Sequence, residues 1–135
     1  MTDEYTTYST TCDDTYPEYE QLYKHFGRVL IARDFGEYSG DTLIVLQAPN
    51  SRYGYLRIGW GSCSGCDALQ ACDTVEEIDI LQRELYDSIV WCDSAGEMGA
   101  WLQAHDWKGD YIGRGDDVLS FVADAIAVLE SEPQP

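Results

Sequence analysis

Three short stretches of the chain are dominated by β-branched, aliphatic and aromatic residues, which predicts three strands. They span residues 28–34, 42–47 and 53–60. The turn residues at 49–51 join the second and third stretches as a hairpin. Antiparallel pairing of neighbouring strands is therefore the expected arrangement.

Four other stretches place apolar residues three and four positions apart, which marks one face of a helix. The first spans 18–26. The second and third begin at the capping patterns of 74–77 and 94–97, in which Ser or Thr precedes Glu by three residues, and the third ends at 108–109. The last begins near Asp116. The apolar stripes are Tyr19, Leu22, Tyr23 and Phe26; Ile78, Leu81, Leu85 and Ile89; Met98, Trp101, Leu102 and His105; and Val118, Phe121, Val122, Ala125, Ile126 and Leu129.

Strands in the first half and helices in the second predict an α+β fold. We expect a small antiparallel sheet of about three strands, covered on one face by about three to four helices. Residues 1–16 have no hydrophobic period and predict a flexible acidic arm, residues 17–131 predict a single domain, and 132–135 a short tail. A hydrophobic content of 44% is ample for one core.

Carboxylates greatly outnumber basic groups in this chain. There are 25 Asp and Glu against 8 Lys and Arg, which gives a formal net charge of −17. Because nucleic acids and anionic membranes are polyanions, this charge argues against direct binding to either. It favours a basic protein surface as partner, such as the groove that holds a nucleic-acid backbone. Selection for solubility or salt adaptation produces the same composition, so both interpretations stay open here.

The compartment follows from the chain's beginning and its cysteines. Residues 1–16 are acidic and rich in Thr and Tyr, unlike a signal peptide, and no apolar stretch approaches the roughly 20 residues of a membrane span. We therefore expect a cytoplasmic protein with reduced thiols. Five cysteines cannot all pair within one chain.

Three cysteines crowd one junction after the third strand. Cys63 and Cys66 have the Cys-x-x-Cys spacing that supplies two thiolates to a zinc ion. Cys72 is a candidate third ligand, and Cys92 or His105 a fourth. The same pair at a helix start suits thiol–disulfide exchange. We favour a third interpretation, in which the thiols pack beneath a glycine-rich turn, because no second Cys-x-x-Cys follows and nearby negative charge opposes thiolate formation.

Candidate catalytic residues are sparse. The two histidines, His25 and His105, lie near the ends of predicted helices, where His usually caps carbonyls. Adjacent carboxylates on a helix face different directions, and no Gly-rich loop ends in the Lys-Ser/Thr pair that cradles phosphates. We therefore expect a non-enzymatic protein without a cofactor, zinc being the one possible exception.

The predicted partner surface lies on the helix that begins at 74–77. Its carboxylates are Glu76, Glu77, Asp79 and Glu84. Tyr53 and Tyr55 alternate onto one face of the third strand, and tyrosines commonly anchor protein interfaces. If a helix covers that face instead, the two tyrosines belong to the core.

The stretch from Tyr53 to Leu69, with its Gly-Trp-Gly-Ser-Cys-Ser-Gly-Cys-Asp-Ala-Leu motif, resembles an uncharacterised group of small acidic bacteriophage and prophage proteins. Cys72 and the segment from His105 to Asp110 extend the resemblance, which covers roughly residues 38 to 111. It implies a phage-borne setting in the cytosol of a bacterial host, in which acidic proteins inhibit host defence or DNA-handling proteins. We predict such an inhibitor, acting by nucleic-acid mimicry. A zinc-stabilised or thiol-redox module is the alternative.

Overall fold

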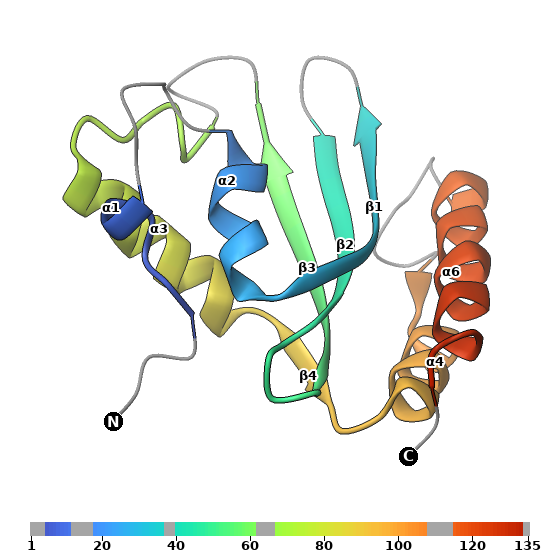
Figure 1. The fold of residues 1–135 in the computed structure, drawn as a ribbon. Helices are drawn as coiled ribbons and strands as arrows, with labels where there is room; N and C mark the ends of the chain where they lie inside the picture. Colours follow the sequence, from blue (N-terminus) through green and yellow to red (C-terminus); the bar gives the residue numbers. More distant parts are fainter. Residues whose placement is uncertain (1–4, 12–17, 37–39, 62–66, 108–114, 134–135) are drawn as a thin grey trace.

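The computed structural model describes residues 5–11, 18–36, 40–61, 67–107 and 115–133. Its elements in chain order are α1 (Tyr8–Thr11), α2 (Tyr19–Tyr23), the 3-10 turn η1 (Lys24–Phe26), β1 (Arg28–Gly36), β2 (Gly40–Gln47), β3 (Tyr53–Trp60), α3 (Val75–Asp87), β4 (Val90–Cys92), α4 (Ala95–Ala104) and α6 (Gly115–Glu130). Figure 1 shows the sheet between two helical layers, with α1, α2 and α3 on one side and α4 and α6 on the other. The predicted α+β class is confirmed.

The sheet is an antiparallel meander with the strand order β1-β2-β3-β4. A tight turn joins β2 to β3. In it the Ser51 amide donates to the Ala48 carbonyl at 2.9 Å, and the Asn50 side chain accepts from the Arg52 amide at 3.0 Å. Ser51 has a φ of 73°, in the left-handed region that tight turns require. The predicted hairpin is therefore confirmed.

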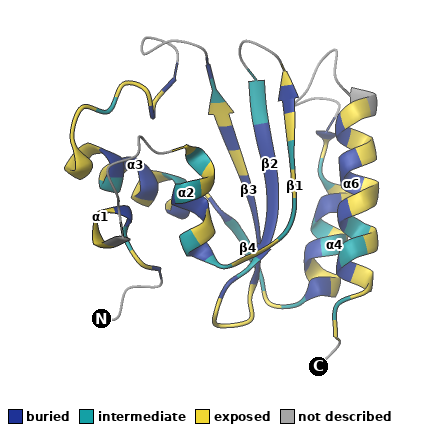
Figure 2. Ribbon diagram, turned by 45° about the horizontal axis from the view of Figure 1, so that its top comes forward, coloured by how far each residue is buried: buried dark blue, intermediate teal, exposed yellow. Residues whose placement is uncertain are grey.

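Both faces of the sheet are covered, so the prediction of one covered face is wrong. On β2, Leu43 and Val45 pack with α4 and α6, whereas Ile44 and Leu46 pack on the opposite face, and none of the four is exposed. Figure 2 shows β2 buried over most of its length. A continuous apolar run, without polar residues at alternate positions, is typical of a strand buried on both faces.

Two helix starts predicted from capping patterns are confirmed. Thr74 Oγ1 accepts a hydrogen bond from the Glu77 amide at 3.2 Å and caps α3. Ser94 Oγ accepts from the Glu97 amide at 3.1 Å and caps α4. Each bond satisfies one amide at a helix start that has no partner within the helix.

The helix ends and the fourth strand differ from the predictions. α3 ends at Asp87, and Ile89 lies in the short connection to β4. α4 ends at Ala104, because His105 takes up an extended conformation, so the predicted end at 108–109 is wrong. The strand β4 was not predicted, since its three residues are too few to show the alternation of a strand.

The first described residues pack against the body of the protein, where the sequence predicted a flexible arm over 1–16. Tyr5 and Tyr8 are only 8% and 5% exposed. The Tyr8 amide donates to Gln82 Oε1 of α3 at 2.8 Å, and the next amide donates to Asp79 Oδ1 at 3.0 Å. Side chains of α3 thus satisfy the first amides of α1.

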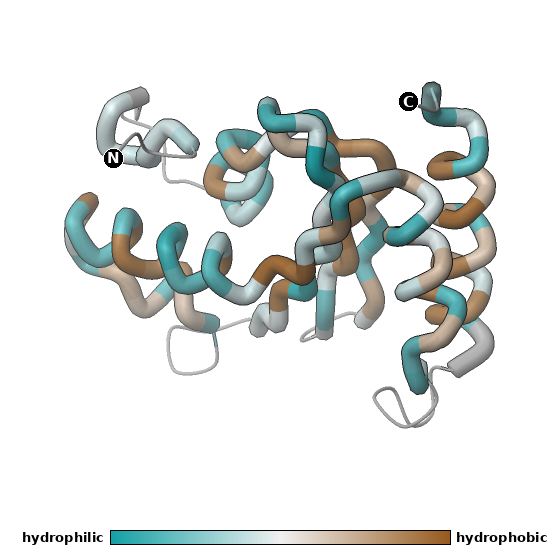
Figure 3. The backbone as a smooth tube through the Cα atoms, turned by 90° about the horizontal axis from the view of Figure 1, so that it is seen from below, coloured by the Kyte–Doolittle hydropathy of each residue, from teal (hydrophilic) through white to brown (hydrophobic). Residues whose placement is uncertain are grey.

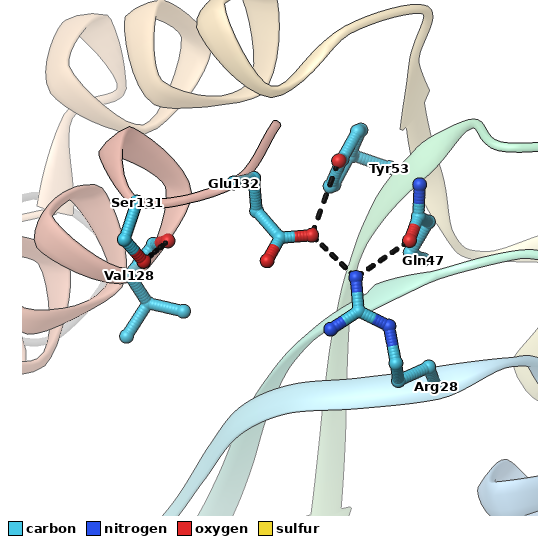
Figure 4. A network of polar contacts seen from close by, with 6 residues as sticks. All are labelled: Arg28, Gln47, Tyr53, Val128, Ser131 and Glu132. Carbon is cyan, nitrogen blue, oxygen red and sulfur yellow. Dashed lines mark hydrogen bonds and ion pairs between the residues drawn. The ribbon is translucent and has the colours of Figure 1, made fainter. Parts of the chain in front are cut away.

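The last described residues are tied to the sheet, although 132–135 was predicted to be a tail. Glu132 Oε1 accepts hydrogen bonds from the Arg28 guanidinium and from the Tyr53 hydroxyl, the latter at 3.2 Å (Figure 4). Arg28 also donates to Gln47 Oε1 at 2.6 Å. These interactions join the residues after α6 to β1, β2 and β3.

Candidate functional site

The outward side of α3 is acidic with an apolar centre. We define the α3 outer face as Glu76, Glu77, Ile80 and Glu84. The three carboxylates are exposed, and within the described part of the chain none forms an ion pair. Ile80 is 61% exposed, the largest value among the described large hydrophobic residues. Figure 3 shows hydrophilic and hydrophobic residues alternating along α3.

One predicted partner residue on α3 has a different role. Asp79 is half-buried and accepts the hydrogen bond from the Ser9 amide, so it holds α1 and does not belong to the α3 outer face. Gln82, which the sequence did not single out, is fully buried and donates to the Leu22 carbonyl at 3.1 Å. Together with its bond to α1, this amide ties α1, α2 and α3 into one layer.

Charge is unevenly compensated over the molecule. The described ion pairs are Arg28–Glu132, Arg33–Asp124, Arg52–Asp93, Arg57–Asp41 and Arg83–Asp87. Four of these arginines belong to the sheet or its turn, and only Arg83 belongs to α3. Glu18, Glu20 and Asp73 are exposed and have no ion pair with any described residue. On the opposite helical layer, Glu97, Asp117 and Glu130 are also exposed without a described ion pair, so uncompensated carboxylates are more numerous on the side of α2 and α3 but are not confined to it.

Tyr53 and Tyr55 are not part of a docking surface. They are 5% and 7% exposed and pack beneath the α4 and α6 layer. The Tyr55 ring lies 5.3 Å from the ring of Trp101 and 5.4 Å from that of Trp107. Because α4 covers this side of β3, the core interpretation holds and the assignment of both tyrosines to a partner surface is wrong.

The Asp67 side chain joins the two described residues on either side of the Cys63 and Cys66 segment, which are Gly61 and Asp67 itself. Asp67 is 6% exposed, and its Oδ2 accepts from the Gly61 amide at 2.9 Å. Its Oδ1 accepts from the Tyr19 hydroxyl at 2.8 Å and from the amides of Leu69 and Gln70 at 2.9 and 3.1 Å. Sequence reasoning missed this residue. Its one signal was an Asp at the start of a turn, where the carboxylate commonly accepts from amides further along.

Tyr19 completes this arrangement from α2. Burial raises the pKa of its phenol well above the ordinary value, the hydrogen bond from the Leu69 amide opposes the shift, and Asp67 adds to it. The phenol therefore stays protonated and donates to Asp67 at neutral pH. A buried carboxylate whose lone pairs are used in this way is a structural group.

The predicted cysteine ligands do not form one set. Cys63 and Cys66 lie outside the described residues. Cys92 pairs with Tyr53 at the start of β3, whereas the flanking residues of the Cys63 and Cys66 segment lie beyond its end. Seven steps of about 3.3 Å separate the two ends by roughly 23 Å, but thiolates on one zinc ion lie within about 5 Å of each other. The assignment of Cys92 to this site is therefore wrong.

The described thiols are poor nucleophiles. Cys72 is half-buried, and burial raises its pKa, followed by the negative charges of Glu77 and Asp73. Burial likewise raises the pKa of Cys92. Both thiols are therefore protonated at neutral pH, which disfavours disulfide exchange at these two positions. Among the described residues, no three His, Cys, Asp or Glu side chains are placed to hold a metal ion.

A cleft of about 470 Å³ lies between α2 and the ends of β1, β2 and β3. We name it the α2 cleft. Its lining residues are Glu18, Tyr19, Glu20, Tyr23, Asp34, Thr42, Trp60, Asp67, Leu69 and Gln70. On one wall, Trp60 Nε1 donates to Thr42 Oγ1 at 3.0 Å, and Thr42 Oγ1 donates to Asp34 Oδ1 at 2.6 Å. No sequence pattern predicted this cleft.

Comparison of the chain with family models, with curated proteins and with solved structures finds no match. The fold and the two acidic features, the α3 outer face and the α2 cleft, are therefore the basis for a functional proposal. Within the described residues, no helix combines the length and the apolar character needed to cross a membrane.

Proposed function

We propose that this protein is a non-enzymatic acidic binding protein, of bacteriophage origin, that occupies a basic surface of a host defence or nucleic-acid-handling protein. The α3 outer face binds this surface. The observation that carries the proposal is the group of three exposed carboxylates without described ion pairs around an isoleucine that is 61% exposed. Such a group combines charge for attraction with apolar surface for affinity.

The density of charge on α3 supports mimicry of a nucleic-acid backbone. Glu76 and Glu84 are eight residues apart, which is about 12 Å along a helix axis, and Glu77 lies between them. One strand of B-DNA places about three to four phosphates over the same length. A groove lined with Lys and Arg for a phosphate backbone is therefore matched in charge by this helix.

Ile80 adds a contribution that a phosphate backbone lacks. Complete burial of an isoleucine side chain contributes about 1.5–3 kcal/mol, and most of this side chain is available. The carboxylates contribute mainly to the rate and specificity of association. Affinity consequently depends on Ile80 and salt sensitivity on the carboxylates.

A pair of triple variants with equal net charge tests the proposal. The α3 triple variant is Glu76→Gln, Glu77→Gln and Glu84→Gln. The control triple variant is Asp93→Asn, Asp117→Asn and Glu130→Gln, all exposed and outside α3. Glutamine retains the side-chain half of a capping box, so α3 keeps its start. Asp93→Asn removes the ion pair with Arg52, but this pair is exposed, spans 3.6 Å and contributes little to stability.

The wild type and both variants are immobilised and exposed to bacterial lysate, and the retained proteins are identified. We expect a nucleic-acid-binding protein to be retained by the wild type and the control but not by the α3 triple variant. Added duplex DNA should release it, and so should an increase in salt, because exposed charges are screened. Retention by all three proteins, or retention insensitive to both salt and DNA, would contradict the proposal.

A further inference from the structure

The α2 cleft has aromatic walls from two different elements. Tyr19 and Tyr23 come from α2 and Trp60 from the end of β3. The hydrogen bond from the Trp60 indole to Thr42 fixes the orientation of that ring. Aromatic faces attract organic cations, and a planar guanidinium both stacks on them and interacts with their electron density. The cleft volume of about 470 Å³ lies within the range of roughly 300–1,000 Å³ typical of ligand sites.

Negative groups converge on the same cleft. Glu20 of α2 and Asp34 of β1 both line it, and within the described residues neither forms an ion pair. Asp34 uses Oδ1 to accept from Thr42, and no hydrogen bond to its Oδ2 is seen among the described residues. Carboxylates that remain uncompensated beside aromatic rings create a site for a cation.

Tyr23 supplies an independent indication of a ligand. Tyr23 lines the cleft and is only 7% exposed. No hydrogen bond of its hydroxyl is seen among the described residues, although polar groups on side chains as buried as this one are normally paired. Burial, Glu20 and Asp34 each raise the pKa of Tyr23, which places both carboxylates within electrostatic reach of the phenol. A donor that enters the cleft would satisfy the hydroxyl oxygen.

We propose that the α2 cleft binds an alkylguanidinium group, which stacks against Trp60 and donates hydrogen bonds to Asp34, Glu20 and the Tyr23 hydroxyl oxygen. The group is either an arginine side chain of a partner protein or a small free guanidinium compound. A guanidinium fits better than an ammonium, because its planar fork of donors matches a carboxylate and its face matches an aromatic ring. This inference goes beyond the proposed function and does not use the α3 outer face.

The site is tested with four probes in the full-length protein. They are butylguanidinium, butylammonium, the peptide Gly-Arg-Gly and the same peptide with citrulline, whose neutral urea replaces the guanidinium. Binding is followed by calorimetry and by the indole N–H resonance of Trp60, assigned with Trp60→Phe. Small ligands of this size that bind a defined site do so with a Kd on the order of 1 mM or tighter. We expect saturable binding of butylguanidinium and Gly-Arg-Gly only.

The two guanidinium probes identify the source of the ligand. Tighter binding of Gly-Arg-Gly supports an arginine of a partner protein, and tighter binding of butylguanidinium supports a free compound. The site assignment stands in either case. Butylammonium or the citrulline peptide binding as tightly as its guanidinium counterpart would overturn it, as would no shift of the Trp60 resonance at tens of millimolar probe.

Single variants with a matched control separate the cleft from general charge. Asp34→Asn retains the acceptor for Thr42 and should weaken guanidinium binding about tenfold, because a charge-assisted hydrogen bond is removed. Glu84→Gln removes one charge from the α3 outer face and should change binding less than about twofold. If the two substitutions weakened binding equally, binding would depend on the net charge of the protein and not on the cleft, which would overturn the proposal.

Tyr23→Phe gives a readout that a purely structural role would not produce. Removal of an unpaired buried hydroxyl leaves the stability unchanged or raises it. If the hydroxyl accepts from the ligand, guanidinium binding weakens severalfold while the melting temperature is maintained. Unchanged binding in Tyr23→Phe would exclude the hydroxyl from the site. The α3 triple variant should bind the guanidinium probes like the wild type, so failure of the proposed function is distinguishable from failure of this inference.

Discussion

Replacement of Asp67 by alanine should destabilise the protein far more than replacement of any exposed carboxylate. Asp67 is the first residue of the described segment 67–107 and accepts four hydrogen bonds, from the Gly61, Leu69 and Gln70 amides and the Tyr19 hydroxyl. In Asp67→Ala all four donors are left without this acceptor. The same substitution removes the hydrogen bond that joins the end of β3, at Gly61, to the turn that begins at Asp67.

The magnitude follows from the burial of the donors. The hydrogen bond from Gly61 is buried, so water does not replace the carboxylate there, and its removal costs about 1–3 kcal/mol. The Leu69 amide keeps the Tyr19 hydroxyl as a second acceptor at 3.1 Å, so loss of its bond to Asp67 costs only about 1 kcal/mol. The Tyr19 hydroxyl adds about 1 kcal/mol, while exposed Gln70 is rehydrated at little cost. The sum is about 3–5 kcal/mol, a large part of the roughly 5–15 kcal/mol that stabilises a typical domain.

Thermal and urea unfolding, followed by circular dichroism, measure this destabilisation. For a chain of this size, about 3–5 kcal/mol corresponds to a decrease in melting temperature of roughly 10–18 °C. Asp67→Asn keeps one acceptor oxygen but presents an amide donor to another donor, so its destabilisation should be about half as large. Asp73→Ala, in the same segment but exposed, should change stability by less than about 0.5 kcal/mol. Equal destabilisation by Asp67→Ala and Asp73→Ala would refute the assignment of a structural role to Asp67.

Three further predictions concern the phenol, the thiols and the chain end. Because burial raises the pKa of Tyr19 above the value of about 10 in an unfolded chain, its stabilisation is complete below pH 10 and is lost as the pH rises further. The stability difference between wild type and Tyr19→Phe should therefore be about 1 kcal/mol at pH 7 and smaller above pH 10, and urea unfolding at both pH values checks this. Protein purified without chelator should contain no stoichiometric zinc by metal analysis; zinc that disappears in Cys63→Ser and is kept in Cys92→Ser would instead establish the metal alternative. Glu132→Gln should lower the free energy of unfolding by about 1 kcal/mol, because the ion pair with Arg28 is removed, and an unchanged urea midpoint would contradict this.

The sequence predicted those parts of the fold that depend on neighbours in the chain. The caps at Thr74 and Ser94 require residues only three positions apart, so their pattern is visible without a structure. The strand β4 is too short to show the alternation of a strand. It forms because the end of α3 places Val90 next to Tyr55 of β3. The burial of the first residues was also not predictable, since it depends on Gln82 of a helix some seventy residues away. Such interactions are tertiary and leave no local period.

The two candidate sites differ in the same way. Glu76, Glu77 and Glu84 were predicted to form a binding surface, and helical periodicity alone places them on the exposed side of α3. Asp79 was predicted to belong to the same surface, but it lies at the edge of the apolar stripe, where it is half-buried and accepts a hydrogen bond from α1. The α2 cleft draws its residues from α2, three strands and the segment after β3, so no spacing in the sequence brings them together.

The position of the arginines helps to distinguish two explanations of the net negative charge, which are solubility and the binding of a cationic partner. Selection for solubility acts on the net charge and favours charges of both signs that are interspersed over the surface. Here the sheet and its turn contain four of the five arginines in described ion pairs, each close to one carboxylate, whereas α3 and α2 hold one between them. Like charges on one side repel each other, and this repulsion opposes folding. Under the proposed function, a cationic partner relieves both this repulsion and the exposure of Ile80 on binding, whereas selection for solubility requires neither.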